Sequence, residues 1–310
     1  MGNLELKLIM RLLITGATGL IGSAIVKQAQ ERGHSIHYLT TTRGKITSAP
    51  GYKGFYWNPA NNEIDFKCFE GVDTIIHLAG ASIFQRWTEK NKEIILKSRT
   101  ASAALLLDSL REINHDVTHL VSASAIGAYP SSLKTIYSEE DDEYHPGFLG
   151  QVVSAWEASA DKFAEQDILV TKIRVGVVLA KDGGALPQIV KPIKLFVGAP
   201  LAGGAQWQSW IHVDDLAGIF LYAIAKKLAG IYNGVSPYPV TNETMTEEVA
   251  KILGRPIIIP NVPGFALKML LGKMSSLVTE SQKVSASKIL MRGYAFQYPQ
   301  LHEALLDLLK

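Results

Sequence analysis

The stretch TGATGLIG (Thr15–Gly22) follows an apolar run over residues 10–14 and leads into a helical pattern that extends to Arg32. A strand, a glycine turn and a helix form the layout that holds a dinucleotide pyrophosphate. Gly16 permits a tight turn, Gly19 lets backbone N–H groups approach phosphate, and Gly22 lets the helix pack close to the strand. The phosphates would lie at a helix N-terminus, where unpaired N–H groups and the helix dipole favour negative charge. Glycines also form ordinary turns, but the flanking strand and helix favour nucleotide binding.

Length and composition restrict the class of protein. The 310 residues exceed the usual size of one domain, so we expect a large domain with an appended lobe, or two domains. The formal net charge of +2 argues against a nucleic-acid partner, and no apolar run approaches the roughly 20 residues of a membrane span. Cys68 is the only cysteine, which excludes an intrachain disulfide and a cysteine-based metal cluster. We expect a cytoplasmic protein that has no metal site and does not bind membranes.

The first nine residues are short and mixed, without the apolar core of a signal peptide. We expect the fold to begin at Met10, with residues 1–9 as an extension or an alternative start.

The end of the second predicted strand, residues 35–40, bears on the choice of cofactor. A cofactor without a 2′-phosphate usually meets an acidic residue about 20 residues past the glycines. No acidic residue occurs between Ile36 and Ile46, where Arg43 and Lys45 stand instead. Because a guanidinium can bind a 2′-phosphate bidentately and stack on adenine, we favour NADP(H) over NAD(H). The alternative is a loop arginine exposed to solvent.

Strands and helices alternate along the first 180 residues. The run over residues 72–78 is almost continuously apolar, as is typical of the centre of a parallel sheet. The alternation predicts an α/β fold, a Rossmann-like doubly wound parallel sheet with helices on both faces. Further strands are predicted over residues 10–14, 35–40, 118–123 and 170–179, a strand and loop over 52–65, and helices over 20–31, 89–112 (with Thr88 as N-cap) and 153–166.

The pattern becomes less regular after residue 184, which indicates a smaller, mostly helical C-terminal lobe that binds substrate. We expect residues 10–180 to form the NAD(P)-binding domain, with residues 211–235 returning to it, and residues 181–210 and 236–310 to form the lobe. The predicted elements are helices over 186–196 (broken by Pro192), from an aspartate N-cap at 214–215 to 227, and over 246–254, 265–271, 281–291 and 301–309, and a short strand and turn over 232–240.

Three side chains near the end of the strand at 72–78 invite a functional interpretation. His77 stands inside the apolar run, so we interpret it as a hydrogen-bonded core residue. Arg86 and Trp87 follow the strand on its carboxyl side, the edge where open α/β sheets bind ligands. They could contact a phosphate or sugar of a substrate. A Trp that packs the loop down is an equally good explanation.

Several motifs resemble the extended short-chain dehydrogenase/reductases of the NAD(P)-dependent epimerase/dehydratase superfamily. They are TGATGLIG (15–22), HLAG (77–80), SASA (122–125), IRVGVVLA (173–180) and WIHVDDLA (210–217). A second set is similar to an uncharacterised "epimerase family" branch, which has its own C-terminal domain and an older label of cell-division inhibitor. This set comprises RW (86–87), SR (98–99), AWEASA (155–160), KDGGAL (181–186), LGRP (253–256), VPGFALKMLLG (262–272) and RGYAFQYPQL (292–301). The resemblance covers residues 10–309.

The resemblance implies particular roles for site residues. Ser124 falls on the family's catalytic serine position, where a hydroxyl can donate to a substrate oxygen and stabilise developing charge. A serine that only bonds backbone is the alternative, and Ser122 is equally available for that role. The cofactor would be held by Gly16, Thr18, Gly19, Leu20, Ile21 and Gly22, by Arg43, and by Leu78, Ala79 and Gly80.

The sequence departs from the family at the acid/base pair. The family uses a Tyr and a Lys four residues later, which lie one helical turn apart, and the ammonium lowers the pKa of the phenol. In this chain the two positions fall near Phe148 and Val152, and neither can move a proton. The neighbours that could do so lack the family's spacing: Tyr129, Tyr144, His145 and Glu157.

Two functions are consistent with these observations. The first is an NADP-dependent oxidoreductase or epimerase that acts on a nucleotide sugar or similar polar small molecule, with Ser124 and a non-standard acid/base. The second is a non-catalytic NADP(H)-binding sensor or scaffold. The oligomeric state is open, a homodimer being one option. For the first function, the substrate cleft would be built from Arg86, Trp87, Trp207, Trp210 and His212.

Overall fold

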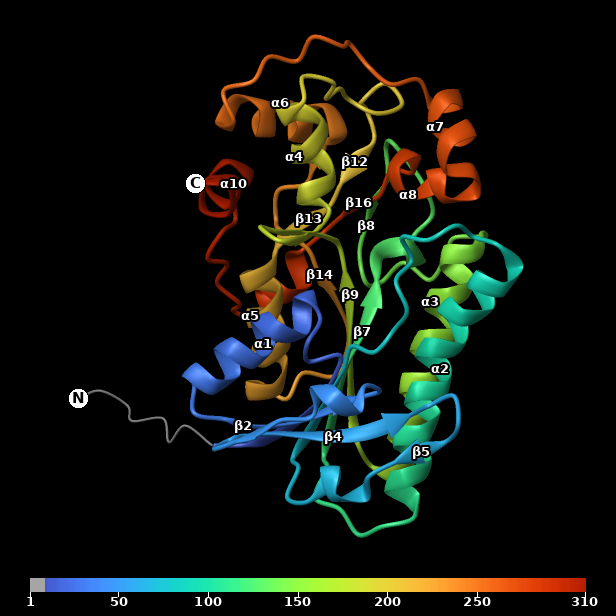
Figure 1. The fold of residues 1–310 in the computed structure, drawn as a ribbon, viewed down its shortest axis with the longest axis vertical. Coiled ribbons are helices and arrows are strands. Elements are labelled where there is room, and N and C mark those ends of the chain that lie inside the picture. Colours follow the sequence, from blue (N-terminus) through green and yellow to red (C-terminus); the bar gives the residue numbers. More distant parts are fainter. Residues whose placement is uncertain (1–8) are drawn as a thin grey trace, which may run out of the picture.

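The computed structural model describes residues 9–310, so the expectation for residues 1–8 lies outside the described part of the chain. A mostly parallel sheet runs through the centre of the molecule in the order β14-β9-β7-β6-β1-β2-β4-β3 (Figure 1). The seven long strands pair in parallel, and the short β3 and β5 pair antiparallel with β4 at one edge. The strands are β1 (Arg11–Thr15), β2 (Ser35–Thr40), β3 (Ser48–Ala49), β4 (Tyr52–Asn58), β5 (Glu63–Ile64), β6 (Thr74–His77), β7 (His119–Ala125), β9 (Leu169–Val175) and β14 (Gly230–Gly234).

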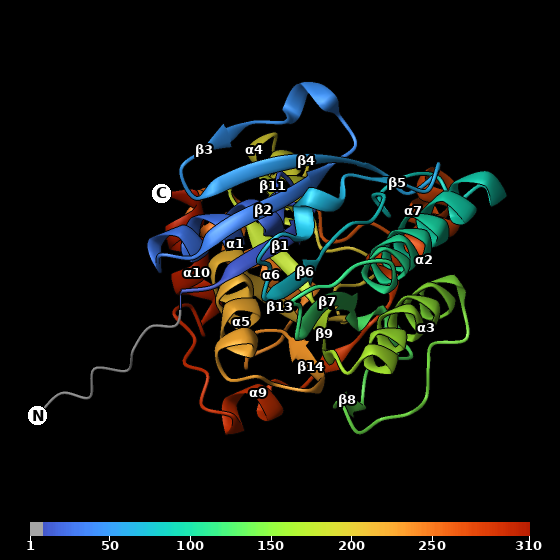
Figure 2. The same ribbon diagram turned by 90° about the horizontal axis from the view of Figure 1, so that it is seen from below.

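Helices cover both faces of this sheet. Figure 2 shows α1 (Leu20–Glu31) and α5 (Val213–Ala225) on one side, and α2 (Glu89–Arg111) and α3 (Phe148–Asp161) on the other. Alternate side chains of β1 supply the two cores, since Leu12 and Ile14 pack on the first side and Leu13 on the second. The strand is apolar throughout because both faces are covered. The predicted doubly wound α/β fold is confirmed.

Two helix starts show what local sequence determines. Thr88 caps α2 as predicted, because its Oγ1 accepts from the N–H of Asn91 at 3.2 Å. For α5 the predicted aspartate cap is wrong. His212 is the N-cap, and its Nδ1 accepts from the N–H of Asp214 at 3.1 Å. Asp214 and Asp215 lie in the first turn instead, where their charge favours the helix dipole.

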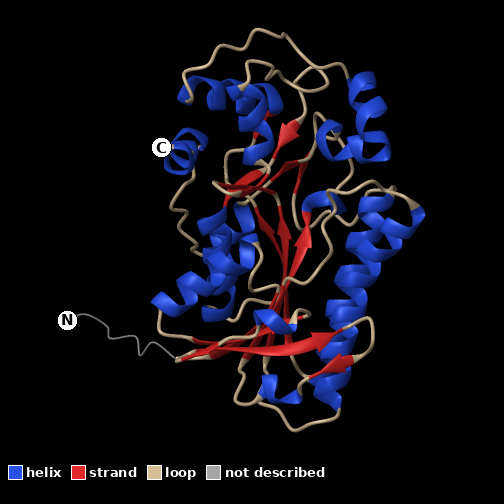
Figure 3. Cartoon of the chain, in the orientation of Figure 1, coloured by secondary structure: helices blue, strands red, loops and turns tan. Residues whose placement is uncertain are grey.

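The C-terminal lobe lies above the carboxyl ends of the sheet strands (Figures 1 and 3). Its apolar core is built around Leu179, Trp210 and Met245. The elements of the lobe and of the segments that join it are β8 (Ile136–Tyr137), β10 (Val177–Ala180), β11 (Gly183–Gly184), α4 (Leu186–Lys194), β12 (Trp207–Gln208), β13 (Trp210–His212), β15 (Val240–Thr241), α6 (Asn242–Ile252), α7 (Gly264–Leu271), α8 (Ser276–Thr279), β16 (Lys283–Val284), α9 (Ser287–Met291) and α10 (Leu301–Leu309).

Several predicted boundaries differ from the structure. The strand expected over 170–179 divides at Gly176, where a Cβ would lie 2.3 Å from Ser209 O. The segment 281–291 contains β16 before a short helix. Pro192 does not break α4, because it stands in the last turn and the helix ends two residues later. Helix α3 begins at Phe148, five residues before the predicted start, and α6 begins at Asn242 because Thr241 caps it.

No helix within residues 9–310 combines the length and the apolar character that crossing a membrane requires.

Candidate functional site

The glycine loop joins β1 to α1 through a turn that only small residues allow. Gly16 has a φ of +70°, and the N–H of Gly19 donates to Gly16 O at 2.9 Å. A Cβ at Gly22 would lie 2.2 Å from the same carbonyl oxygen. The helix therefore packs directly on the turn, as the spacing of the glycines predicts.

The N-terminus of α1 is suited to an anion. Gly19 is the N-cap and supplies no side-chain hydrogen bond, and the first turn contains no acidic residue. The unpaired N–H groups of that turn are consequently left to an outside acceptor. A Cβ at Gly19 would meet only Gly16 O within 4 Å, at 3.2 Å, so the outer side of the loop is open. These residues fit the pyrophosphate of a dinucleotide.

Thr15 ties the glycine loop to the end of β6. Its Oγ1 accepts from the N–H groups of Leu78 and Ala79, at 2.9 and 3.0 Å. The same hydroxyl lies 3.0 Å from Nδ1 of His77, and Nε2 of that ring lies 3.2 Å from Ser102 Oγ. Burial lowers the pKa of His77 to about 4, so the ring is neutral. His77 is thus a hydrogen-bonded core residue, as the sequence predicts.

Part of the C-terminal lobe packs on the same loop. The hairpin of β10 and β11 brings Gly183 and Gly184 against Leu20, at the first position of α1. A Cβ at Gly183 would lie 2.8 Å from Leu20 Cδ1. The glycines of the KDGGAL motif therefore let the lobe approach the glycine loop closely.

Arg43 lies just past the end of β2, in a 3₁₀ turn over Arg43–Lys45. Its guanidinium carbon is 3.8 Å from the ring centroid of Tyr56 on β4. The stacking supports an otherwise exposed side chain and leaves its N–H edge open to solvent. This is the strand end at which a dinucleotide fold binds the adenine ribose.

Ser124, near the end of β7, belongs to a buried polar network around Glu157 of α3. Its Oγ donates to Glu157 Oε1 at 2.5 Å. Arg174 of β9 donates to both carboxylate oxygens, at 2.8 and 3.0 Å. Tyr144 completes the network, since its hydroxyl donates to Glu157 Oε2 at 2.7 Å and lies 3.1 Å from Nη2 of the arginine. Ser122 instead bonds the carbonyl of Ala123 at 3.0 Å.

Ionisation within this network is fixed by the arginine. Burial alone would raise the pKa of Glu157, but the hydrogen bonds and charge of Arg174 outweigh it, and the pKa is lowered. Burial and the hydrogen bond to Glu157 raise the pKa of Tyr144 to about 12. Near neutral pH the carboxylate is therefore charged and the phenol keeps its proton. The network provides one acceptor and several donors, without the lowered phenol pKa of the family's Tyr–Lys pair.

Phe148 and Val152, near which the family's Tyr and Lys are expected from the sequence, lie in the first turns of α3. Val152 is buried, whereas Phe148 at the helix start is half-buried. Trp87 packs edge-on to Phe148 with ring centroids 5.0 Å apart, and Lys92 Nζ is 5.6 Å from the Phe148 centroid. Trp87 also donates from Nε1 to Ile83 O at 3.0 Å. The structure thus places Trp87 beside Phe148, near which the family's tyrosine is expected from the sequence.

The other suggested substrate residues lie in different surroundings. Arg86 is exposed next to Trp87. Trp207 donates to Leu133 O at 3.1 Å, and Lys283 Nζ is 3.8 Å from its ring. Trp210 and His212 are 0% and 1% exposed, and their side chains bond Tyr238 O and the start of α5. The last two therefore contribute to packing within the lobe and do not line an open surface.

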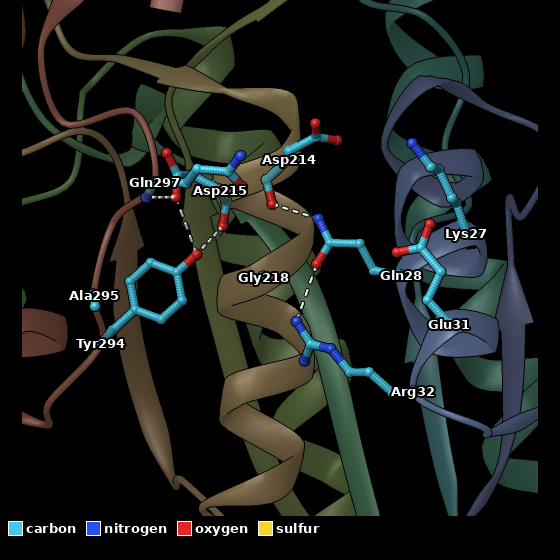
Figure 4. A pocket seen from close by; sticks show the side chains of 10 residues that line it. All are labelled: Lys27, Gln28, Glu31, Arg32, Asp214, Asp215, Gly218, Tyr294, Ala295 and Gln297. Carbon is cyan, nitrogen blue, oxygen red and sulfur yellow. Dashed lines mark hydrogen bonds between the residues drawn. The ribbon is translucent and has the colours of Figure 1, made fainter.

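A cavity of about 470 Å³ lies away from the glycine loop, between the second half of α1 and α5 (Figure 4). Its wall includes Asp215, whose carboxylate accepts from the N–H groups of Gln297 and Tyr298, at 2.7 and 2.8 Å. The Tyr294 hydroxyl donates to Asp215 O at 2.8 Å. These bonds attach the segment before α10 to the sheet domain. Asp215 of the WIHVDDLA motif therefore has a structural role.

Sequence reasoning missed how the polar network is assembled. Glu157 was one of four open candidates, and Arg174 had no assigned role. The sequence did contain a signal. Glu157 lies in the apolar stretch AWEASA and Arg174 in IRVGVVLA, and a charged residue buried in such a stretch needs a partner of opposite charge. Which strand and helix would face one another depends on the sheet order, which the motifs do not specify.

The chain is similar to known proteins over most of its length. A model described as "NAD dependent epimerase/dehydratase family" matches residues 12–234, and a domain of unknown function (DUF1731) matches residues 262–308. The Arabidopsis thaliana "Epimerase family protein SDR39U1 homolog, chloroplastic" is 36% identical over 300 residues, covering 96% of this chain and 86% of that protein. An epimerase family protein of Staphylococcus saprophyticus is 36% identical over 298 residues, covering 96% and 98%.

Solved structures agree with these matches. The human epimerase family protein SDR39U1 (isoform 2) with NADPH superposes with a TM-score of 0.84 at 29% identity, covering 96% of this chain and 99% of that chain. A nucleoside-diphosphate sugar epimerase from Corynebacterium glutamicum superposes with a TM-score of 0.77 at 28% identity, covering 96% and 58%. The resemblance identified from the motifs is confirmed.

Proposed function

The chain belongs to the NAD dependent epimerase/dehydratase family, and on that basis we propose that it binds NADP(H) and acts as an oxidoreductase or epimerase on a nucleotide sugar or a similar polar small molecule. The observation that carries the proposal is the uncapped N-terminus of α1 behind an open glycine loop, which fits a pyrophosphate. A bound nicotinamide would supply hydride transfer. A cytoplasmic setting is part of this proposal.

Arg43 supports the preference for NADP(H). Its guanidinium is stacked on Tyr56 at the ribose end of the site, and no carboxylate between residues 36 and 46 would repel a 2′-phosphate. The human relative carries NADPH.

Ser124 and Glu157 supply the proposed acid/base chemistry. A substrate hydroxyl at Ser124 Oγ would give its proton to that oxygen while the serine proton moves to Glu157 Oε1, 2.5 Å away. The reverse transfers would return the proton to a substrate carbonyl oxygen. Arg174 keeps Glu157 ionised, so that a carboxylate oxygen can accept the proton, although the lowered pKa makes Glu157 a weak base, and Tyr144 holds the second carboxylate oxygen in place.

The cofactor proposal is tested by fluorescence titration of the wild type and Arg43→Ala with NADPH and with NADH. We expect wild type to prefer NADPH, and Arg43→Ala to lose that preference with little change for NADH. Lys53→Ala removes an exposed cation from the neighbouring strand β4 and serves as the control. Equal affinity of the wild type for both cofactors would reject the NADP(H) assignment.

The activity is tested with a panel of nucleotide sugars and carbonyl compounds, followed by nicotinamide absorbance and product analysis. Turnover that Ser124→Ala removes and Ser122→Ala retains supports the proposed chemistry. Absence of turnover with NADPH demonstrably bound contradicts it.

A second function, a non-catalytic NADP(H) sensor or scaffold, is favoured by one observation. The Ser124 hydroxyl already donates to a buried carboxylate. The sequence adds that the expected acid/base positions fall near Phe148 and Val152, which cannot move a proton. This function predicts cofactor affinity without turnover. It also predicts that Gly19→Glu abolishes the cellular phenotype, while Ser124→Ala leaves it intact.

A further inference from the structure

Arg99 is a buried cation at the ligand-binding edge of the sheet. It stands on α2, only 7% exposed, with its guanidinium carbon 4.8 Å from the ring centroid of Trp156 on α3. Nη1 donates to Ile95 O at 2.9 Å and to Ala81 O at 3.1 Å. Its charged group therefore lies between two helices and the turn that follows β6.

Within residues 9–310, no carboxylate lies at ion-pair distance from this guanidinium. Nε is buried and has no hydrogen-bond partner in this described part of the chain. Burial lowers the pKa of Arg99 to about 10, with no nearby charge acting against it. Because a buried charge is normally paired, the arrangement lacks an anion.

Gly80 explains how the guanidinium reaches the ligand side of the fold. A Cβ at that position would lie 3.0 Å from Arg99 Cζ, and 3.2 and 3.3 Å from its two terminal nitrogens. Any side chain directed there would press on the charged group. The turn over residues 79–81 is joined through Thr15 to the glycine loop, so Arg99 lies beside the proposed cofactor site.

We propose that Arg99 binds a phosphate group of a ligand held at the carboxyl edge of the sheet, and that this phosphate is the missing partner of its guanidinium. The inference rests on the proposed function for the use of this edge as a nucleotide site. A guanidinium presents N–H donors in a planar fork that suits phosphate oxygens. Two sources carry this chemistry, the pyrophosphate of the cofactor and the diphosphate of a nucleotide-sugar substrate.

The test compares Arg99→Met and Arg99→Lys with the wild type. Arg111→Met is the matched control, because Arg111 stands at the other end of α2 and pairs with Asp108 and Glu165 at the surface. Tryptophan fluorescence, to which the adjacent Trp156 contributes, follows titration with NADPH, NADH and sodium pyrophosphate, and with UDP at saturating NADPH.

If the cofactor is the source, Arg99→Met weakens NADPH and NADH equally, by about tenfold or more, as loss of a charge-assisted hydrogen bond predicts. If the substrate is the source, cofactor affinity is kept and UDP binding falls by a similar factor. Arg99→Lys recovers part of either loss, because it keeps the charge without the fork. Changes no larger than those of Arg111→Met for all four probes would overturn the inference.

Thermal unfolding separates this role from a structural clamp. The ligand-free Arg99→Met protein should keep the wild-type midpoint, while pyrophosphate raises the midpoint of the wild type alone. A lowered midpoint of the ligand-free variant with unchanged ligand shifts would show a clamp. If Arg99→Met does not fold, Arg99→Lys and Gly80→Ala carry the same comparison. Failure of the wild type to bind either dinucleotide would reject the proposed function, and sodium pyrophosphate would still test Arg99.

Discussion

Glu157 accepts four hydrogen bonds from three side chains, and its only ion-pair partner in the described chain is Arg174. Both members of the pair are 3% exposed at the side chain, so neither can be rehydrated when the other is removed. The network is therefore the place where single substitutions have the largest expected effect on the sheet domain.

Glu157→Gln should lower the free energy of unfolding by about 3–5 kcal/mol, because it leaves a buried guanidinium without its counter-charge. Glu165→Gln, at the exposed partner of Arg111, should change it by no more than about 1 kcal/mol. Urea unfolding followed by circular dichroism measures both. Equal, small effects for the two variants would show that the buried pair contributes little.

The same residue predicts how stability depends on pH. The folded-state pKa of Glu157 lies below its unfolded value of 4.5. Its contribution to stability is therefore fully present above pH 4.5 and is lost as the pH falls through the folded pKa. Between pH 5 and 3 the wild type should lose more stability than Glu157→Gln does. The other carboxylates occur in both proteins, so their contributions cancel in this difference. Parallel pH profiles for the two proteins would contradict this.

Ser124→Ala, measured in any reaction found in the substrate panel, should lower kcat by about 10²–10⁴-fold if the serine relays a proton. Ser122→Ala, two residues earlier on the same strand and bonded only to backbone, should have little effect. Cofactor affinity should be unchanged in both variants. Retained kcat in Ser124→Ala would assign the serine a structural role.

At the scale of single residues, the sequence predicted best those positions where a close contact with a backbone atom allows only glycine. The roles of Gly16 and Gly22 follow from a fixed spacing, and the structure shows the close contacts that the spacing requires. The partners of Ser124 could not be predicted, since Glu157 is 33 residues away and its orientation depends on how α3 lies on the sheet. Arg99 was noted only within the SR motif and received no role, because nothing in the sequence shows which arginine lacks a counter-ion.

At the scale of elements, the glycine loop and α1 make a testable unit. Gly22→Ala should lower the free energy of unfolding by at least about 1–3 kcal/mol, because its Cβ would lie 2.2 Å from a carbonyl oxygen that cannot move freely. Gly19→Ala should keep most of the stability, since its Cβ faces open space apart from one contact, and should weaken cofactor binding instead. Unfolding and fluorescence titration of the two variants measure this difference. Lost stability in Gly19→Ala together with weakened cofactor binding in a stable Gly22→Ala would contradict the proposed geometry.

The element boundaries show where local pattern was sufficient. Helix α1 matches its predicted limits because apolar periodicity and glycines at both ends define it, and strand β2 matches because its apolar run begins soon after Gly33. The strand over residues 170–179 was predicted as continuous, since no local signal shows that Ser209 O occupies the space beside Gly176. The cap of α5 was also missed, because a histidine ring accepts from the helix N-terminus there in place of the usual aspartate.

At the scale of the whole molecule, Asp215 attaches the last part of the chain to the sheet domain. Asp215→Ala would leave the N–H groups of Gln297 and Tyr298 without their acceptor, at an expected cost of about 1–3 kcal/mol each. We expect faster proteolysis within residues 294–300 and a lower unfolding midpoint. Asp214→Ala, one residue earlier, is the control. Unchanged proteolysis in Asp215→Ala would show that α10 is held by its apolar contacts alone.

The order in which the chain fills the sheet has a consequence for its synthesis. Strand β14 is the last to join the sheet, and α5, which covers α1, is made only after β10, β11 and α4 of the lobe. A ribosome-bound chain that ends before residue 213 therefore leaves uncovered the side of α1 that packs on α5, where Gln28 donates to Asp214 O. The sheet domain therefore cannot be completed until α5 and β14 leave the exit tunnel, and we expect the emerging chain to be prone to aggregation before that point.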